Sequence, residues 1–144
     1  MKLINKNRGF SLIEIMVVLA IMGLMAAIVA PRVMDALSKG QGQKVRADFK
    51  NFETALKIYK MDNGFFPTSE QGLEALVSKP EGTPEPRSYP SNGYMDRLPK
   101  DPWQYDYIYI SPGEGRAYDI YSLGADGLEG GEDDAADLSV WDEQ

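Results

Sequence analysis

Carboxylates are the residues of this chain that could do chemistry, because two commoner reactive groups are missing. The sequence has neither Cys nor His among its 144 residues. This excludes disulfides, thiolate metal sites and the Ser-His-Asp and Cys-His catalytic arrangements. An enzyme of this composition would have to use carboxylates, Lys or Tyr alone. Two sets of carboxylates stand out, an acidic stretch near the C-terminus and a single Glu14 inside an apolar run.

The acidic stretch runs from Asp126 to Gln144 and carries eight acidic residues and no basic one, against a formal net charge of -7 for the whole chain. Oxygen donors without His or Cys suit a hard cation, and Ca²⁺ above all. The run Asp126-Gly127-Leu128 does not fit an EF-hand, which needs an oxygen ligand at its third position. Composition alone leaves a calcium site and a solvated acidic tail equally open. The acidic balance argues against nucleic acid as a partner.

Glu14 lies in the apolar run from Phe10 to Ala30, which has the roughly 20 residues needed to span a bilayer. A carboxylate in hydrocarbon costs about 2.5–3.5 kcal/mol on insertion scales, so its presence needs a reason. The segment before the run carries only basic charge, from Lys2, Lys6 and Arg8. This pattern predicts a cytoplasmic start and places residues after about 31 on the other side of the membrane.

The elements that position these carboxylates follow from periodicity. A helix is predicted from Phe10 to Asp62, because its second half has apolar residues spaced 4, 3, 4 and 3 apart: Val45, Phe49, Phe52, Leu56 and Tyr59. Asn63-Gly64 supplies a stop, and Thr68 with Gln71 predicts a short capped helix over 69–77. Alternating segments 105–111 and 117–123 predict a β-hairpin. The fold class is therefore α+β, a long transmembrane and amphipathic helix packed on a small antiparallel sheet.

The hexapeptide Gly9-Phe10-Ser11-Leu12-Ile13-Glu14 resembles the processing site of type IV pilin-like proteins. The resemblance implies that a prepilin peptidase cuts between Gly9 and Phe10 and methylates the new amine of Phe10. It divides the chain into a leader (1–9), a transmembrane and fibre-core segment (10–30) and a periplasmic pilin-like head (31–144). It also implies that Glu14 meets the Phe10 amine of a neighbouring subunit. Pairing within one chain and a Glu14 without any role are the alternatives.

Three further segments, 55–76, 98–109 and 121–138, resemble the major pseudopilin of type II secretion systems. The resemblance implies a structural subunit, not an enzyme, that polymerises from the inner membrane into a periplasmic fibre and drives export of folded proteins across the outer membrane. The implied partners are further copies of the chain, prepilin peptidase, minor pseudopilins, the inner-membrane assembly platform and membrane lipid. A type IV pilin is the alternative within the family, although those chains usually carry a disulfide. A calcium-binding enzyme or adaptor with a ligand face of hairpin tyrosines is the alternative from another class.

The same resemblance favours calcium in the acidic stretch. It implies side-chain ligands Asp126, Asp133 and Asp134, and carbonyl ligands Leu123, Leu128 and Gly131. Glu129, Glu132 and Asp137 would then face solvent or stand behind the ligands. One departure from the family is Gln104, since many relatives have Gly after the tripeptide Asp101-Pro102-Trp103, and the turn there is expected to differ.

Overall fold

The computed structural model describes residues 9–142, so the basic residues Lys2, Lys6 and Arg8 lie outside the described part. The chain divides into two compact units, Met1–Lys39 and Gly40–Gln144. One helix, α1 (Leu12–Asn63, 52 residues), runs through both units and contains Pro31.

The first part of α1 is apolar and exposed. Its most apolar stretch has a mean hydropathy of 2.7, and none of that stretch is buried by residues 9–142. The helix is thus long and apolar enough to cross a membrane, which agrees with the predicted span. Its start at Leu12, not Phe10, corrects the predicted boundary, because Ser11 caps the helix from outside.

The second part of α1 supplies the core of the unit Gly40–Gln144. The predicted stripe is confirmed, since all five of its side chains are buried. The rings of Phe49 and Phe52 meet the ring of Tyr107 edge to face, with centroids 5.6 and 5.2 Å apart. Such aromatic pairs add about 0.5–1.5 kcal/mol to the free energy of apolar burial. The amphipathic half of the helix is therefore fixed to the sheet by aromatic packing.

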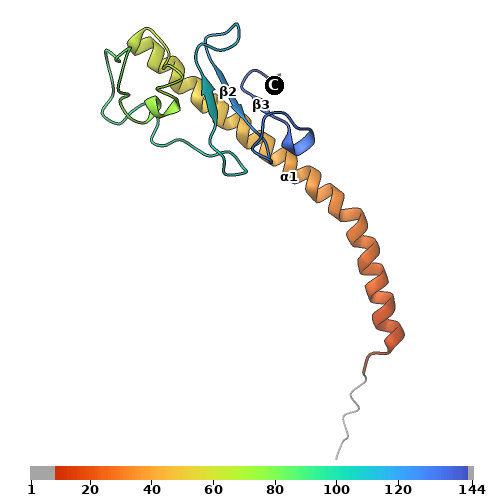
Figure 1. The fold of residues 1–144 in the computed structure, drawn as a ribbon. Helices are drawn as coiled ribbons and strands as arrows, with labels where there is room; N and C mark the ends of the chain where they lie inside the picture. The colour runs from red at the N-terminus through yellow and green to blue at the C-terminus, as the bar shows by residue number, and fades with distance from the viewer. Residues whose placement is uncertain (1–8, 143–144) are drawn as a thin grey trace, which may run out of the picture. The chain divides into compact units, whose positions relative to one another are not determined.

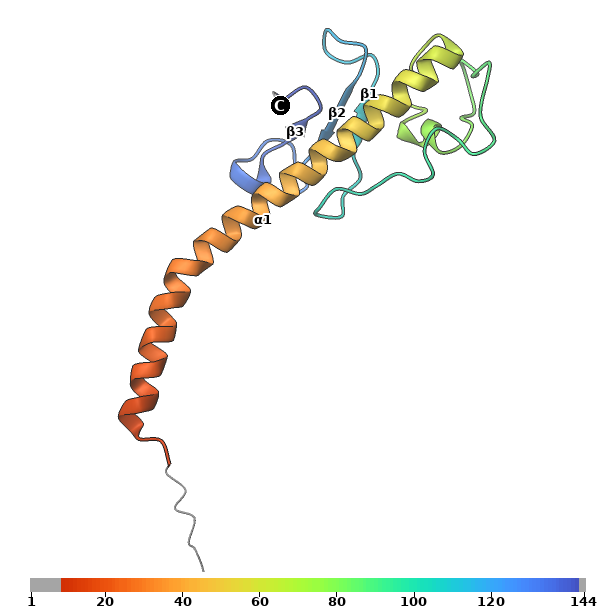
Figure 2. The same ribbon diagram turned by 180° about the vertical axis from the view of Figure 1, so that it is seen from behind.

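The sheet has three antiparallel strands in the order β1-β2-β3: β1 (Ile108–Ile110), β2 (Asp119–Ser122) and β3 (Leu138–Ser139). Figure 1 and Figure 2 show it beside the second part of α1. The predicted hairpin is confirmed by the pairing of Tyr109 with Ile120. The third strand was not predicted. It lies within the acidic stretch and pairs with β2, so the acidic loop between β2 and β3 is attached to the sheet at both ends.

Two short 3₁₀ helices complete the elements, η1 (Leu73–Leu76) and η2 (Asp133–Ala135). The predicted helix over 69–77 shrinks to η1, because Gly72 has a φ of 63° and interrupts the helical path. Its predicted cap is nevertheless present. The amide of Thr68 donates to the side chain of Gln71 at 3.1 Å, and the amide of Gln71 donates to the Thr68 hydroxyl at 3.2 Å.

The proline-rich segment between η1 and β1 is fastened to the end of α1. Asn63, the last residue of α1, donates to the hydroxyl of Tyr94 at 3.0 Å and accepts from the amide of Ser88 at 3.0 Å. The predicted stop is confirmed by Gly64, which has a φ of 88°. This segment is thus ordered by side-chain hydrogen bonds and not by regular structure.

Candidate processing, assembly and cation sites

The predicted cleavage site lies at the exposed start of α1. Gly9 and Phe10 are both exposed, and the Phe10 side chain has 82% of its surface accessible. Both residues precede the first residue of the helix, Leu12. The bond between them is therefore in non-helical chain, where a peptidase can bind the backbone in extended form.

Ser11 and Glu14 cap the start of α1 reciprocally. The amide of Ser11 donates to Oε2 of Glu14 at 3.0 Å, and the amide of Glu14 donates to the Ser11 hydroxyl at 3.2 Å. This is the Ser-x-x-Glu capping box, which satisfies two helix-terminal amides at once. A carboxylate here also interacts favourably with the positive end of the helix dipole. Glu14 therefore makes hydrogen bonds within the chain. This differs from the alternative in which Glu14 has no role.

Sequence reasoning missed Ser11 as a functional residue, although its signal was present. The spacing of three between Ser11 and Glu14 is the same signal that predicted the cap at Thr68 and Gln71. The sequence prediction considered only the charge of Glu14 in an apolar run and not its hydrogen-bond partners.

The backbone of the acidic stretch folds back on itself. The amide of Ala125 donates to the carbonyl of Asp134 at 2.8 Å, which brings the start of the stretch next to its middle. Gly131 has a φ of 93°, and a Cβ there would collide with the carbonyl of Ala135. Only glycine allows so close an approach in this conformation. The loop is thus a closed turn that brings the residues near Asp126 and those near Asp134 to one end of the sheet.

The three predicted carboxylate ligands lie on the surface of this turn. Asp126, Asp133 and Asp134 are exposed, and Oδ1 of Asp126 accepts from the amide of Leu128 at 3.0 Å. Among residues 9–142, no three acidic side chains come together in a group that could hold a metal ion. The fold therefore brings their backbone together but not their carboxylates. Because they are exposed, these side chains can turn inward without breaking core packing.

The predicted carbonyl donors occupy three different parts of the loop. Leu123 follows β2 directly and is half-buried, whereas Leu128 keeps 67% of its surface exposed. Gly131 lies at the close approach to Ala135. The donor set is oxygen only, which is the chemistry that Ca²⁺ requires.

Asp137 has a carboxylate oxygen that needs a partner. Its Oδ2 accepts from the amide of Gly130 at 3.0 Å, whereas its Oδ1 is buried with no hydrogen-bond partner among the described residues. A buried carboxylate oxygen without a partner is costly. Asp137 therefore does not face solvent, which was one of the two expectations for it. A cation in this loop would interact favourably with that oxygen, and the oxygen-only donor set around it has the chemistry that Ca²⁺ requires.

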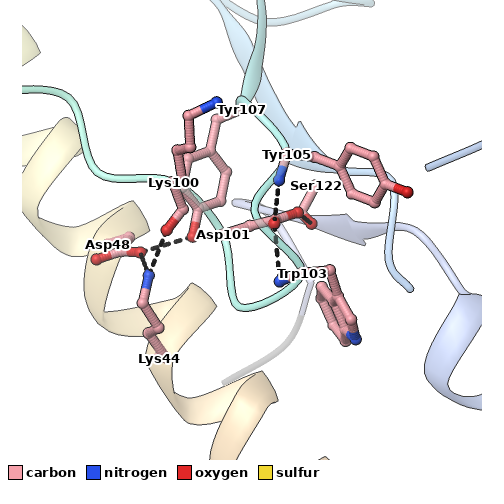
Figure 3. Close-up of polar contacts among 8 residues, drawn as sticks. All are labelled: Lys44, Asp48, Lys100, Asp101, Trp103, Tyr105, Tyr107 and Ser122. Atoms are coloured by element: carbon pink, nitrogen blue, oxygen red, sulfur yellow. Dashed lines mark hydrogen bonds and ion pairs between the residues drawn. The ribbon is translucent and has the colours of Figure 1, made fainter. Parts of the chain in front are cut away.

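A buried carboxylate outside the acidic stretch, Asp101, was not predicted to have a structural or functional role. Asp101 is fully buried, and its Oδ2 accepts from the hydroxyl of Ser122 at 2.7 Å. Figure 3 shows this contact next to a second buried pair, Asp48 and Tyr107. The Asp-Pro sequence signals a turn, but its partner 21 residues later has no signal in the sequence.

The hairpin tyrosines do not form an outer ligand face. Tyr107, Tyr109 and Tyr118 are buried in the core, and only Tyr105 and Tyr121 reach the surface. Burial raises the pKa of Tyr107, and the hydrogen bond to Asp48 raises it further. These three side chains pack in the core. They are therefore not available to form the ligand face that the enzyme or adaptor alternative requires.

Two family models match this chain. The model described as type II secretion system protein G matches residues 32–141, and the model of the prokaryotic N-terminal methylation motif matches residues 4–30. The first match covers most of the chain and favours the type II secretion branch over a type IV pilin. The second covers the hexapeptide on which the resemblance to pilin-like proteins rests.

Characterised relatives match over almost their whole length. The type II secretion system core protein G of Vibrio cholerae is 49% identical over 144 residues, covering 100% of this chain and 98% of the relative. That of Pseudomonas aeruginosa is 48% identical, covering 96% and 97%. The crystal structure of the major pseudopilin of enterohaemorrhagic Escherichia coli matches with a TM-score of 0.68 and 46% identity. It covers 75% of this chain and 92% of that structure.

Proposed function

Because the chain belongs to the type II secretion system protein G family, we propose that it polymerises from the inner membrane into a periplasmic fibre that exports folded proteins. Its role as a structural subunit of the pseudopilus follows from the family and from the major pseudopilin that its fold matches. The observation that carries the proposal is the apolar part of α1, whose most apolar stretch no residue of the described part of the chain buries. Exposed apolar surface of this extent needs lipid or other subunits around it.

The membrane orientation in this proposal comes from charge. The basic leader stays in the cytoplasm, α1 crosses the inner membrane, and the acidic head lies in the periplasm. The head then meets the minor pseudopilins in the fibre, while the membrane part meets the assembly platform and lipid. Nucleic acid is not among the partners proposed for a chain of formal net charge -7.

Prepilin peptidase is proposed to cut between Gly9 and Phe10 and to methylate Phe10. The match to the methylation motif and the exposed, non-helical position of this bond support the assignment. The test is the mass of the chain extracted from membranes of cells that express the peptidase. We expect N-methyl-Phe10 at its start, whereas an intact leader or a start after Ala30 would contradict the proposal.

Glu14 is proposed to set the register between subunits. Cleavage removes the leader's positive charges and creates an ammonium group on Phe10, four residues before Glu14, whose carboxylate accepts from the amide of Ser11. In apolar surroundings an ammonium and a carboxylate each lower the cost of burying the other. The amine of a neighbouring subunit can approach the carboxylate on its open side, because Glu14 is exposed within its own chain.

Calcium is proposed as the ion that closes the acidic loop. The side chains of Asp126, Asp133 and Asp134 and the carbonyls of Leu123, Leu128 and Gly131 would hold it. When bound, the ion neutralises carboxylates that otherwise repel one another and so couples metal binding to folding of the C-terminal segment. The buried Oδ1 of Asp137 and the glycine turn at Gly131 support this assignment.

The fibre proposal is tested in cells that lack their own major pseudopilin. Expression of this chain together with the remaining secretion components should restore export of a folded exoprotein. A chain that is processed and inserted in those cells, yet supports neither export nor fibres, would contradict the proposed function.

A further inference from the structure

Asp101 binds three hydrogen-bond donors from two parts of the head. Its Oδ1 accepts from the amides of Trp103 and Tyr105 at 3.0 and 2.8 Å, and its Oδ2 accepts from the hydroxyl of Ser122 at 2.7 Å. Asp101 is fully buried, as is Ser122. A buried carboxylate is tolerated only where such donors satisfy it. Figure 3 shows how this carboxylate joins the turn over 101–105 to the end of β2.

Ser122 transmits this contact to the first residues of the acidic loop. Its hydroxyl donates to Asp101 and accepts from the amide of Gly124 at 3.3 Å. Gly124 has a φ of 65°, and a Cβ there would lie 2.8 Å from the carbonyl oxygens of Ala135 and Ala136. The backbone is therefore fixed on both sides of Leu123, the first proposed carbonyl ligand.

The turn over 101–105 touches the acidic loop a second time through Tyr105. A Cβ on Gly127 would lie 2.8 Å from Cζ of the Tyr105 ring, so the ring packs directly on the backbone of Gly127. Gly127 stands between the proposed ligands Asp126 and Leu128. The same turn thus supports the loop at two places, and Asp101 shapes that turn.

We infer that Asp101, acting through Ser122, is a positioning residue for cation binding by the acidic loop. The inference rests on the proposed calcium site and goes beyond it, because neither residue is a proposed ligand. A loop held in its binding conformation loses less conformational entropy when the ion binds, and its affinity is higher for that reason. Without the Ser122 hydroxyl, the amide of Gly124 loses its hydrogen bond to that side chain. The backbone around Leu123 is then more mobile, and the Leu123 carbonyl no longer keeps the direction that binding needs.

The test compares calcium affinity with stability in the full chain in detergent. The variants are Ser122→Ala and Asp101→Asn, and the matched control is Tyr109→Phe. The control removes a buried hydrogen bond of 2.8 Å to the carbonyl of Pro67, away from the loop. Calcium titration calorimetry gives the dissociation constant at a temperature at which each variant is folded. Melting in chelator gives the stability of the metal-free head.

We expect calcium to bind Ser122→Ala and Asp101→Asn at least tenfold more weakly than wild type. Tyr109→Phe should melt lower in chelator but bind calcium within twofold of wild type. A Ser122→Ala chain with wild-type affinity would overturn the inference while leaving the calcium site intact. If Asp101→Asn does not fold, Ser122→Ala alone decides. A wild-type chain that binds no calcium would overturn the proposed site and the inference with it.

Discussion

The hydroxyl of Tyr107 donates a hydrogen bond of 2.6 Å to Oδ2 of Asp48, across 59 residues of sequence. The same oxygen accepts from Nζ of Lys44 at 2.7 Å, and Lys44 also donates to the carbonyl of Lys100. This network ties the second part of α1 to the segment that leads into β1 (Figure 3). It holds the head on the helix by directed contacts in addition to apolar packing.

Removing that hydroxyl should destabilise the head. Tyr107→Phe keeps the ring contacts with Phe49 and Phe52 but leaves a buried oxygen of Asp48 with one donor fewer. The expected loss is about 1.5–3 kcal/mol, the usual contribution of a hydrogen bond to a charged group, because Lys44 still donates to the same oxygen. Urea unfolding of a fragment from residue 35 onward measures it. Tyr105→Phe, the same change at a surface tyrosine, should leave the unfolding midpoint unchanged. Equal midpoints for both variants would contradict the role of the Asp48 contact.

The head should lose stability steeply above pH 10. Burial raises the pKa of Tyr109 and of Tyr118 to about 12, against about 10 for an exposed tyrosine. Between these values the folded state keeps protons that the unfolded chain has lost, so stability falls as the pH rises. Below pH 10 this contribution is fully present.

Tyrosinate absorbance at 295 nm and helical circular dichroism check this pH dependence together. The buried tyrosines should ionise in the same cooperative step in which the helical signal is lost. Complete ionisation of the tyrosines near pH 10, with the helical signal unchanged, would contradict the burial of these hydroxyls.

Gln104→Gly should stabilise the head. Gln104 has a φ of 74°, in the left-handed region that costs a residue with a side chain about 1–2 kcal/mol. Glycine avoids this cost, but it loses more conformational entropy on folding, which lowers the free energy of unfolding by roughly 0.5–1 kcal/mol. A net gain of up to about 1 kcal/mol is expected, seen as a rise of a few degrees in melting temperature. Gln43→Gly, the same change on an exposed face of α1, should lower it. A fall at both positions would show that the turn does not strain Gln104.

Calcium should stabilise the head through the acidic loop. A ligand that binds only the folded state at a hundredfold excess over its Kd adds about 2.7 kcal/mol. The melting temperature of the fragment should therefore fall by several degrees or more when chelator replaces calcium. Asp126→Ala should melt low in both conditions, and Glu132→Ala, an exposed neighbour outside the proposed ligand set, should respond as wild type does. If the melting temperature of the wild-type fragment is the same in calcium and in chelator, the loop is a solvated acidic tail and the calcium site is contradicted.

Local patterns predicted the elements of the head, because the signals for them lie within a few residues. The stripe from Val45 to Tyr59, the hairpin and the cap at Thr68 and Gln71 are all confirmed. The helix over 69–77 was largely wrong, since Gly72 takes a φ of 63° that no periodicity reveals. The strand β3 was missed because its two residues are too few to show alternation.

The candidate sites also divide into those with a local sequence signal and those that only the fold brings together. The hexapeptide at Gly9 has a signature in the sequence, and the methylation-motif match over 4–30 agrees with it. The supports of the acidic loop have none, because Asp101 and Ser122 meet across 21 residues through the fold alone. The calcium ligands stay a prediction. Within the described range 9–142, no three acidic side chains form a group that could hold a metal ion, so the fold alone does not assemble these ligands.

The proposed action of Glu14 in assembly depends on its charge, and a comparison of two variants tests that dependence. Glu14→Leu and Ser11→Ala both remove the capping box, but only the first removes the carboxylate. Both chains should be processed at Gly9 and inserted in the membrane, as the mass of the extracted chain reports.

The deciding measurement is the yield of pseudopilus fibres sheared from cells that overproduce each chain. The charge-pairing account predicts that Ser11→Ala still forms fibres, while Glu14→Leu forms none or very few. Normal fibre formation by processed and inserted Glu14→Leu would contradict the account, because no carboxylate would then be left to meet the Phe10 amine of the next subunit.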